Sequence, residues 1–160
     1  MWRKIPDTLE IPIWKEMAEE LLGSRVEGLA ARSLSLRIKF MQENLTKLQM
    51  NIVLFIGMLS RFCGKDRAII PKLSDFELCG VSKTKIGAQL EALVEAKVIT
   101  WEKGTDANYF EIRKLKDWET TPNVGFHLQR TRELLMLNMR DAGIDTDVII
   151  EKILTKHNLI

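Results

Sequence analysis

The chain has 160 residues, of which 46% are hydrophobic and 29% charged, and its formal net charge is +2 at pH 7. This length and composition favour one globular domain with extensions, and the small net charge does not by itself indicate a nucleic-acid partner. No apolar run reaches the ~18 residues of a membrane span, and no apolar run follows the basic residues near the N-terminus as in a signal peptide. We therefore expect a cytoplasmic protein that makes no membrane contact.

The side chains that enzymes and metal sites need are sparse. Cys63 and Cys79 are too isolated for a disulfide framework or a zinc site, so we predict two buried free thiols. His127 and His157 lie far apart and are expected at the surface or in an interface. No glycine-rich phosphate loop and no G-x-S-x-G motif is present. We expect no enzyme activity, no cofactor and no metal.

The N-terminal residues predict an extension that contacts another subunit. Pro6 and Pro12 disfavour helix in the residues before them, so residues 1–11 are expected to form an extended arm. A helix is predicted from Pro12 to Gly23, and its apolar face has to pack on the core or on a second subunit. An aromatic residue on an arm is often an anchor in a neighbouring subunit. The predicted oligomer interface contains Trp2, Trp14, Met17 and Leu21.

Residues 33–40 alternate between apolar and polar side chains. The apolar members are Leu34, Leu36, Ile38 and Phe40. Strict alternation is typical of a half-buried strand, which is the structure we predict for these residues. A helix through residues 26–40 is the alternative, because Gly28 alone does not forbid it.

The next segment predicts a buried helix and a short strand. Thr46 and Gln49 have the spacing of a capping box, which places a helix start at this point. Residues 48–62 are apolar almost all round, which is typical of a central, buried helix. Gly64 ends it, and residues 68–70 are consistent with a short strand before Pro71.

Residues 74–113 predict a helix-turn-helix followed by a hairpin. Ser74 and Glu77 form a second capping signature, and Gly80 ends the short helix that they open. A helix of about fourteen residues should then begin at Ser82, the predicted N-cap. Its buried stripe contains Ile86, Leu90, Leu93 and Val94. The β-rich runs 98–103 and 109–113, separated by turn-forming residues, predict a hairpin. A hairpin directly after a helix-turn-helix is typical of a winged helix.

The C-terminal region predicts a linker over residues 114–125, a helix over residues 126–142 and a last helix capped by Asp145 or Thr146. The expected fold is mostly α with a small β-sheet (α+β): a winged helix-turn-helix with an N-terminal helix and strand extension and C-terminal helices. We predict three regions: the extension at 1–44, the winged-helix domain at 45–116 and a helical segment at 117–160.

The basic residues gather before and within the predicted winged helix. Residues 45–73 contain five basic side chains against one acid, whereas residues 117–160 contain five against seven. Phosphate contacts are predicted for Lys47, Arg67, Lys72, Lys83, Lys103 and Arg113. Contacts at the start of the reading helix are predicted for Ser82, and base contacts for Thr84, Lys85, Ala88 and Gln89. Glu91 and Glu95 would repel phosphates, so contact should be confined to the first half of that helix and the hairpin.

Several motifs in residues 45–99 carry a family resemblance. They are L-T-x-x-Q before the buried helix, the basic loop at 64–67, S-x-x-x-L-x-G-V-S at 74–82 and L-V-E-A-K-V-I at 93–99. The segment resembles the N-terminal winged-helix domain of phage replication initiators of the lambda O type and of DnaD-like replication proteins. The resemblance implies a replication-initiation role, with double-stranded DNA and a helicase or helicase loader as partners, and a homodimer formed through the extension.

Two other functions are compatible with the same patterns. One is a winged-helix transcription regulator, which would bind duplex DNA but hold no helicase. The other is a protein-interaction module that uses the fold without touching DNA.

Overall fold

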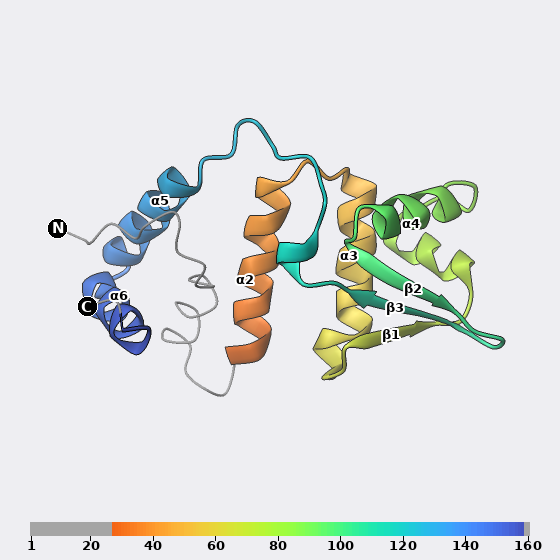
Figure 1. Cartoon of the computed structure of the whole chain (residues 1–160), viewed down its shortest axis with the longest axis horizontal. Helices are drawn as coiled ribbons and strands as arrows, with labels where there is room; N and C mark the ends of the chain where they lie inside the picture. Colours follow the sequence, from red (N-terminus) through yellow and green to blue (C-terminus); the bar gives the residue numbers. More distant parts are fainter. Residues whose placement is uncertain (1–26, 159–160) are drawn as a thin grey trace. The chain divides into compact units, whose positions relative to one another are not determined.

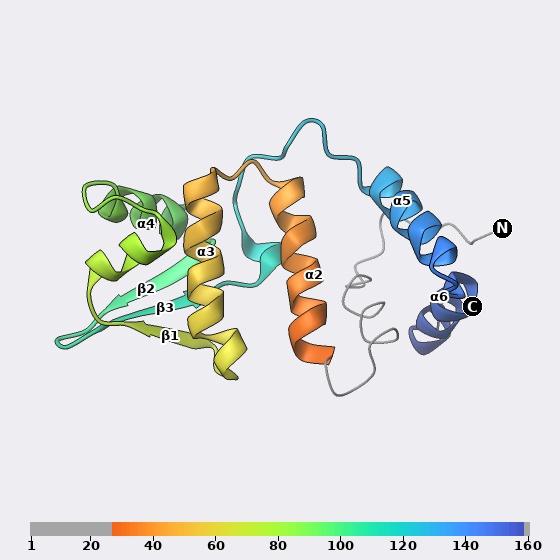
Figure 2. The same ribbon diagram turned by 180° about the vertical axis from the view of Figure 1, so that it is seen from behind.

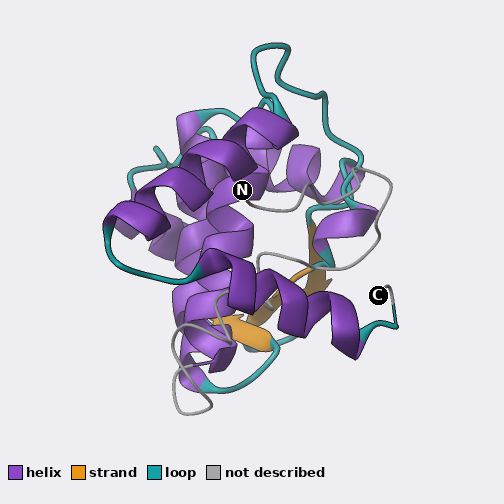
Figure 3. Cartoon of the chain, turned by 90° about the vertical axis from the view of Figure 1, so that its left-hand side faces the viewer, coloured by secondary structure: helices purple, strands orange, loops and turns teal. Residues whose placement is uncertain are grey.

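The computed structural model describes residues 27–158, with side chains from residue 34 onward. Figures 1 and 3 show mostly helix with one small sheet, which confirms the predicted α+β class. The helices are α2 (Glu27–Gln42), α3 (Lys47–Leu59), α4 (Ile86–Glu95), α5 (Leu128–Asp141) and α6 (Thr146–Lys156). The strands are β1 (Arg67–Ile70), β2 (Ile99–Lys103) and β3 (Asn108–Ile112), and short 3₁₀ helices are η1 (Arg61–Cys63), η2 (Leu73–Cys79) and η3 (Leu115–Asp117).

The chain divides into two compact units. One is Lys39–Asn123, called here the central unit, and the other combines Met1–Ile38 with Val124–Ile160. Within the central unit, Asn44 N donates to Thr121 O at 2.7 Å and Asn123 N donates to Gln42 O at 2.8 Å. The central unit thus extends beyond residues 45–116, the range expected for the winged-helix domain. The domain boundaries at 45 and 116 stay a prediction. The four predicted interface residues Trp2, Trp14, Met17 and Leu21 lie outside the described residues.

Helix α3 begins at the predicted capping box. Thr46 Oγ1 accepts from Gln49 N at 3.2 Å, and Gln49 Oε1 accepts from Thr46 N at 3.0 Å. These two bonds satisfy backbone donors that no intrahelical carbonyl can reach. The helix then ends at Leu59, and Gly64 ends the following turn η1 with a φ of 74°.

Only one side of α3 is buried. Ile52, Val53 and Ile56 are fully buried, but Leu54 and Met58 are half exposed and Phe62, in η1, is 68% exposed. The prediction of a helix buried all round is therefore wrong for this face. Leu54 and Met58 are four positions apart and so share one face of α3, away from the side that packs on the sheet and α4, and Phe62 adds exposed apolar surface just beyond the end of the helix.

The sheet of the central unit has the order β1-β3-β2, with both pairs antiparallel. Its hairpin confirms the predicted one, and Gly104 N donates to Ala107 O at 2.9 Å across the turn. A Cβ at Gly104 would stand 2.7 Å from Ala107 O. The turn therefore requires glycine at this position.

Four aromatic rings connect the helices of the central unit to its hairpin. Phe55 of α3 contacts Phe76 of η2 at 5.6 Å between centroids, and Phe76 contacts Phe110 of β3 at 5.2 Å, both edge to face. Phe110 stacks on Trp101 of β2 at 5.7 Å. Phe76 and Phe110 are completely buried, so this aromatic chain forms the centre of the core.

Residues 33–40 form the second half of α2, so the predicted strand is wrong and the helical alternative is correct. The structure shows why alternation misled. Leu34 and Ile38 are separated by four residues, so one helical face includes both. A strand here would also have needed a neighbour for its backbone groups, whereas a helix satisfies them internally. The three described strands pair only with one another.

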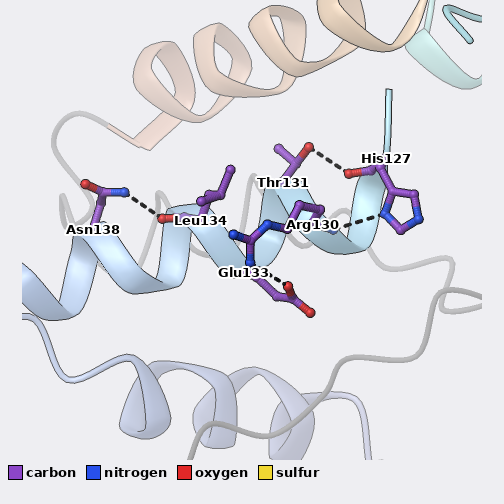
Figure 4. A network of polar contacts seen from close by, with 6 residues as sticks. All are labelled: His127, Arg130, Thr131, Glu133, Leu134 and Asn138. Carbon is purple, nitrogen blue, oxygen red and sulfur yellow. Dashed lines mark hydrogen bonds and ion pairs between the residues drawn. The ribbon is translucent and has the colours of Figure 1, made fainter. Parts of the chain in front are cut away.

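In the second unit, α5 and α6 share a hydrophobic cluster that includes Met136, Ile150 and Ile153. Asp145 Oδ1 accepts from Val148 N at 3.2 Å, which identifies Asp145 as the cap of α6. Figure 4 shows that His127 Nδ1 accepts from Arg130 N at 3.3 Å, so this exposed histidine caps α5. The structure thus assigns His127 a local role at a helix start.

The two cysteines are unpaired, as predicted, but they are not both buried. Cys63 is exposed, because it lies in η1 beyond the end of α3, and Cys79 is half-buried. Burial raises the pKa of the Cys79 thiol, whose Sγ donates to Phe76 O at 3.1 Å. Among the helices of residues 27–158, none combines the length and apolar character needed to cross a bilayer.

Candidate nucleic-acid interface

The predicted reading helix is shorter than expected and begins later. Lys85 N donates to Ser82 O at 2.9 Å, which closes a turn before α4, and Gln89 N donates to Lys85 O at 3.0 Å as the helix continues. The prediction that Ser82 is the N-cap is therefore wrong. Its hydroxyl lies 3.5 Å from Thr84 Oγ1, so it contacts the turn and not the first helical N–H groups.

The short helix η2 before this turn also begins differently from the prediction. Lys72 N donates to Asp75 Oδ2 at 3.0 Å, so the capping carboxylate is Asp75 and the predicted pair of Ser74 and Glu77 is not used. The predicted stop is correct, since Gly80 has a φ of 92°. The result is a short helix, a glycine turn and α4 in succession.

Helix α4 packs by a narrow apolar stripe. Ile86, Leu90 and Leu93 are buried, as predicted, but Val94 is 38% exposed and was assigned wrongly. Val94 lies about 80° round the helix from Ile86, at about 100° per residue, and so reaches the edge of the packed face. The helix therefore keeps its whole outer side, including Val94, accessible.

The start of α4 presents the predicted contact residues to solvent. Ser82, Lys83, Thr84, Lys85 and Ala88 are exposed, and Gln89 is half-buried. Lys83 and Lys85 have no acidic partner within the described part of the chain. Their charges are therefore available to an anionic ligand.

A second pair of lysines, Lys72 and Lys103, lies at the end of the sheet where the hairpin turns. Ile70, Asn108 and Lys103 occupy one row across the sheet, and Asn108 Nδ2 donates to Pro71 O at 3.3 Å. This bond ties the loop that leads to Lys72 to the same end of the sheet. Figures 1 and 2 show the start of α4 at that end of the central unit as well.

The side chain of Lys103 is held in place by an aromatic ring. Its Nζ lies 4.4 Å from the centroid of Trp101, whose Nε1 donates to Asn108 Oδ1 at 3.1 Å. The roles of Trp101 and Asn108 were not predicted, although Trp101 stands two residues from Lys103 in the same strand and so on the same face. Nothing in the sequence indicated these hydrogen bonds of Asn108, which was expected only as a residue of the turn.

The other predicted cations are placed differently. Arg67 Nη1 lies 3.0 Å from Glu102 Oε2, and the guanidinium stacks 4.2 Å from the Tyr109 centroid. Arg113 follows β3 at the end of the sheet opposite the turn, where its backbone N donates to Val98 O at 2.9 Å. Lys47 is exposed at the first position of α3. The structure thus brings Lys72 and Lys103 to one end of the sheet and leaves Lys83 and Lys85 exposed in the turn before α4, whereas Arg113 lies at the other end of the sheet.

The second half of α4 is acidic. Glu91, Val94 and Glu95 line a groove with Trp101 and Lys103, and its volume is about 480 Å³. We call it the α4–β2 groove. Both carboxylates are exposed and would oppose phosphate at this part of the helix. Within residues 27–158, no three His, Cys, Asp or Glu side chains gather as metal ligands.

Comparison with known proteins gives one family. The family model described as bacteriophage replication protein O matches residues 12–118. That range includes the whole of the sheet, α2 to α4 and the candidate interface. No curated protein and no solved structure matches the chain.

Proposed function

Since that match spans more than half of its length, the chain belongs to the bacteriophage replication protein O family, and we propose that it binds duplex DNA through a winged helix. Membership supports a role in the initiation of phage DNA replication. The DNA contact, the designation as a winged helix and the partners are the parts that we propose.

The order of elements supports the winged helix. In the central unit α3 is followed by β1, η2, α4 and the β2–β3 hairpin, and β3 lies between the other two strands. In this scheme η2 and α4 are the helix-turn-helix, joined through Gly80, and the hairpin is the wing. The aromatic chain from Phe55 to Trp101 connects α3 and η2 to the wing, and α4 adds the buried Ile86, Leu90 and Leu93 to the same unit.

One observation supports DNA binding most directly. Lys72, Lys83, Lys85 and Lys103 are exposed, and none has an acidic partner among the described residues. Four exposed cations without an ion-pair partner favour an anionic ligand such as a DNA backbone.

We assign the contacts by position. Lys72, Lys83 and Lys103 bind phosphates and fix the orientation of the protein. Thr84, Lys85, Ala88 and Gln89 face the bases, with Lys85 suited to a guanine edge and Gln89 to adenine. Arg67 contributes less, because its charge is already paired with Glu102. The protein acts by binding and not by catalysis.

The proposed partners follow from membership in the family and from exposed apolar side chains. A homodimer would use Trp2, Trp14, Met17 and Leu21 of the extension. A helicase or helicase loader would use the C-terminal helices, where Leu134, Leu137 and Val148 are exposed. Large exposed apolar residues on amphipathic helices are typical of protein contacts.

Two measurements test this function. Fluorescence anisotropy with a random-sequence duplex at low salt should show binding, and no detectable binding at 20 μM protein would refute the DNA-binding role. Co-purification from phage-infected cells after nuclease treatment should recover a helicase or its loader. Recovery of RNA polymerase without either of them would favour a transcription regulator.

A further inference from the structure

The α4–β2 groove is an open surface depression of about 480 Å³ with a partly apolar lining. Val94 and the Trp101 ring supply apolar surface, and Val94 is more exposed than its neighbours on the packed stripe of α4. An apolar surface that is bordered by charges favours a partner of defined sequence over nonspecific adhesion.

The charges around the groove have a specific arrangement. Glu91 and Glu95 are one helical turn apart, and neither has a hydrogen-bond or ion-pair partner in the part of the chain that the structure describes. Like charges at this spacing destabilise a helix unless a cation neutralises them. Lys103 lies on the opposite side with its Nζ over Trp101. A matching ligand therefore has two cations and a large apolar side chain.

The chain itself contains a segment with this composition. Residues 1–7 read MWRKIPD, in which Arg3 and Lys4 stand between Trp2 and Ile5 and are followed by Asp7. No other segment in residues 1–26 has two adjacent cations. The segment therefore offers cations for the two glutamates and apolar groups for the floor.

We propose that the α4–β2 groove of one copy binds residues 1–7 of a second copy. This inference rests on the proposed homodimer and identifies the receiving surface for its arm. Arg3 and Lys4 pair with Glu91 and Glu95, while Trp2 or Ile5 covers the apolar floor. In a two-fold dimer the contact occurs twice, once for each arm.

The proposal also connects assembly to DNA binding. The groove lies on the same helix as Lys85, and its carboxylates oppose phosphates on that helix. Arms that neutralise Glu91 and Glu95 remove this repulsion, so the dimer should bind DNA more tightly than the monomer. Linkage then requires that DNA also strengthen the dimer by the same factor.

Charge exchange in the full-length chain tests the contact. Sedimentation velocity over a concentration series gives the dimer dissociation constant for wild type, Glu91→Lys/Glu95→Lys and Arg3→Glu/Lys4→Glu. Each double variant should raise that constant by at least ~tenfold, because like charges then face one another in the contact. Glu77→Lys/Glu111→Lys is the matched control, since these exposed acids lie outside the groove. Circular dichroism and the thermal midpoint verify that each variant is folded.

Mixing distinguishes a second copy from the chain's own arm. In an equimolar mixture of the two variants, the unchanged arm meets the unchanged groove and the reversed arm meets the reversed groove. Dimers should reappear in the mixture. If mixing restores nothing, or if groove reversal leaves the dissociation constant within twofold of wild type, the proposal is wrong.

A further outcome separates this inference from the function proposed above. If the wild-type chain is monomeric at every concentration, both the homodimer and the arm contact are refuted. DNA binding is measured independently by anisotropy, so that result would leave the DNA-binding role standing.

Discussion

Replacing both lysines at the start of α4 by alanine tests how many phosphates the interface contacts. Four exposed lysines, Lys72, Lys83, Lys85 and Lys103, have no ion-pair partner among the described residues and are proposed to contact DNA. Each phosphate contact releases counterions and contributes about −0.9 to the slope of log K against log salt, so the three proposed for Lys72, Lys83 and Lys103 give about −2.7. Raising the salt fourfold, from 50 to 200 mM, should then weaken duplex binding by roughly 40-fold.

The double variant Lys83→Ala/Lys85→Ala leaves two of these contacts. Its slope should fall to about −1.8, and the same salt change should weaken binding only by roughly 12-fold. Fluorescence anisotropy with one duplex at five salt concentrations measures both slopes. The matched control is Lys65→Ala/Lys116→Ala, which removes the same charge from exposed positions outside the group.

The control separates local contacts from net charge. It should lower affinity slightly through the long-range field while its slope stays near the wild-type value. If the control and the double variant reduce the slope equally, the protein binds DNA through overall charge, and the assignment of α4 as the contacting helix is wrong.

Three further predictions concern the fold that supports the interface. Phe110→Ala removes the middle ring of the aromatic chain and should lower the free energy of unfolding by about 3–5 kcal/mol in urea; a loss below 1 kcal/mol would contradict its central place. Thr46→Ala should cost about 1 kcal/mol because it removes the cap of α3, while Thr46→Ser should keep most of that stability. Because the pKa of Cys79 is raised, less of it is thiolate at pH 8, so iodoacetamide should label Cys63 faster. Labelling of Cys79 should accelerate as pH rises, and equal rates at pH 8 by mass spectrometry would exclude this environment.

Features that depend on a few neighbouring residues were predictable from the sequence. The cap at Thr46, the stop at Gly80 and the hairpin follow from local hydrogen-bonding and turn preferences. The error at residues 33–40 arose because alternation and helical spacing both place Leu34 and Ile38 on one side. Local pattern cannot say whether a neighbouring strand exists to pair with, and here none does among the described residues.

The candidate site was less predictable, because contacts between residues distant in the sequence decide which basic side chains belong to it. Arg67 and Glu102 stand 35 positions apart, and only the sheet register brings them together across β3. That pairing gives Arg67 an acidic partner, while Asn108, which is in register with Lys103, donates to Pro71 O beside Lys72. Residue type identified the basic side chains, but strand order decided which of them act together.

The aromatic chain from Phe55 to Trp101 has a mechanical consequence. Trp101 stacks on the fully buried Phe110 and lies against Lys103, and Ile86 at the start of α4 is buried in the same unit, so packed side chains hold both contact elements. Interdigitated interiors resist compression and do not deform gradually. The hairpin and the start of α4 should therefore keep a fixed separation. A difference between that separation and the width of the DNA groove must then be absorbed by bending of the duplex.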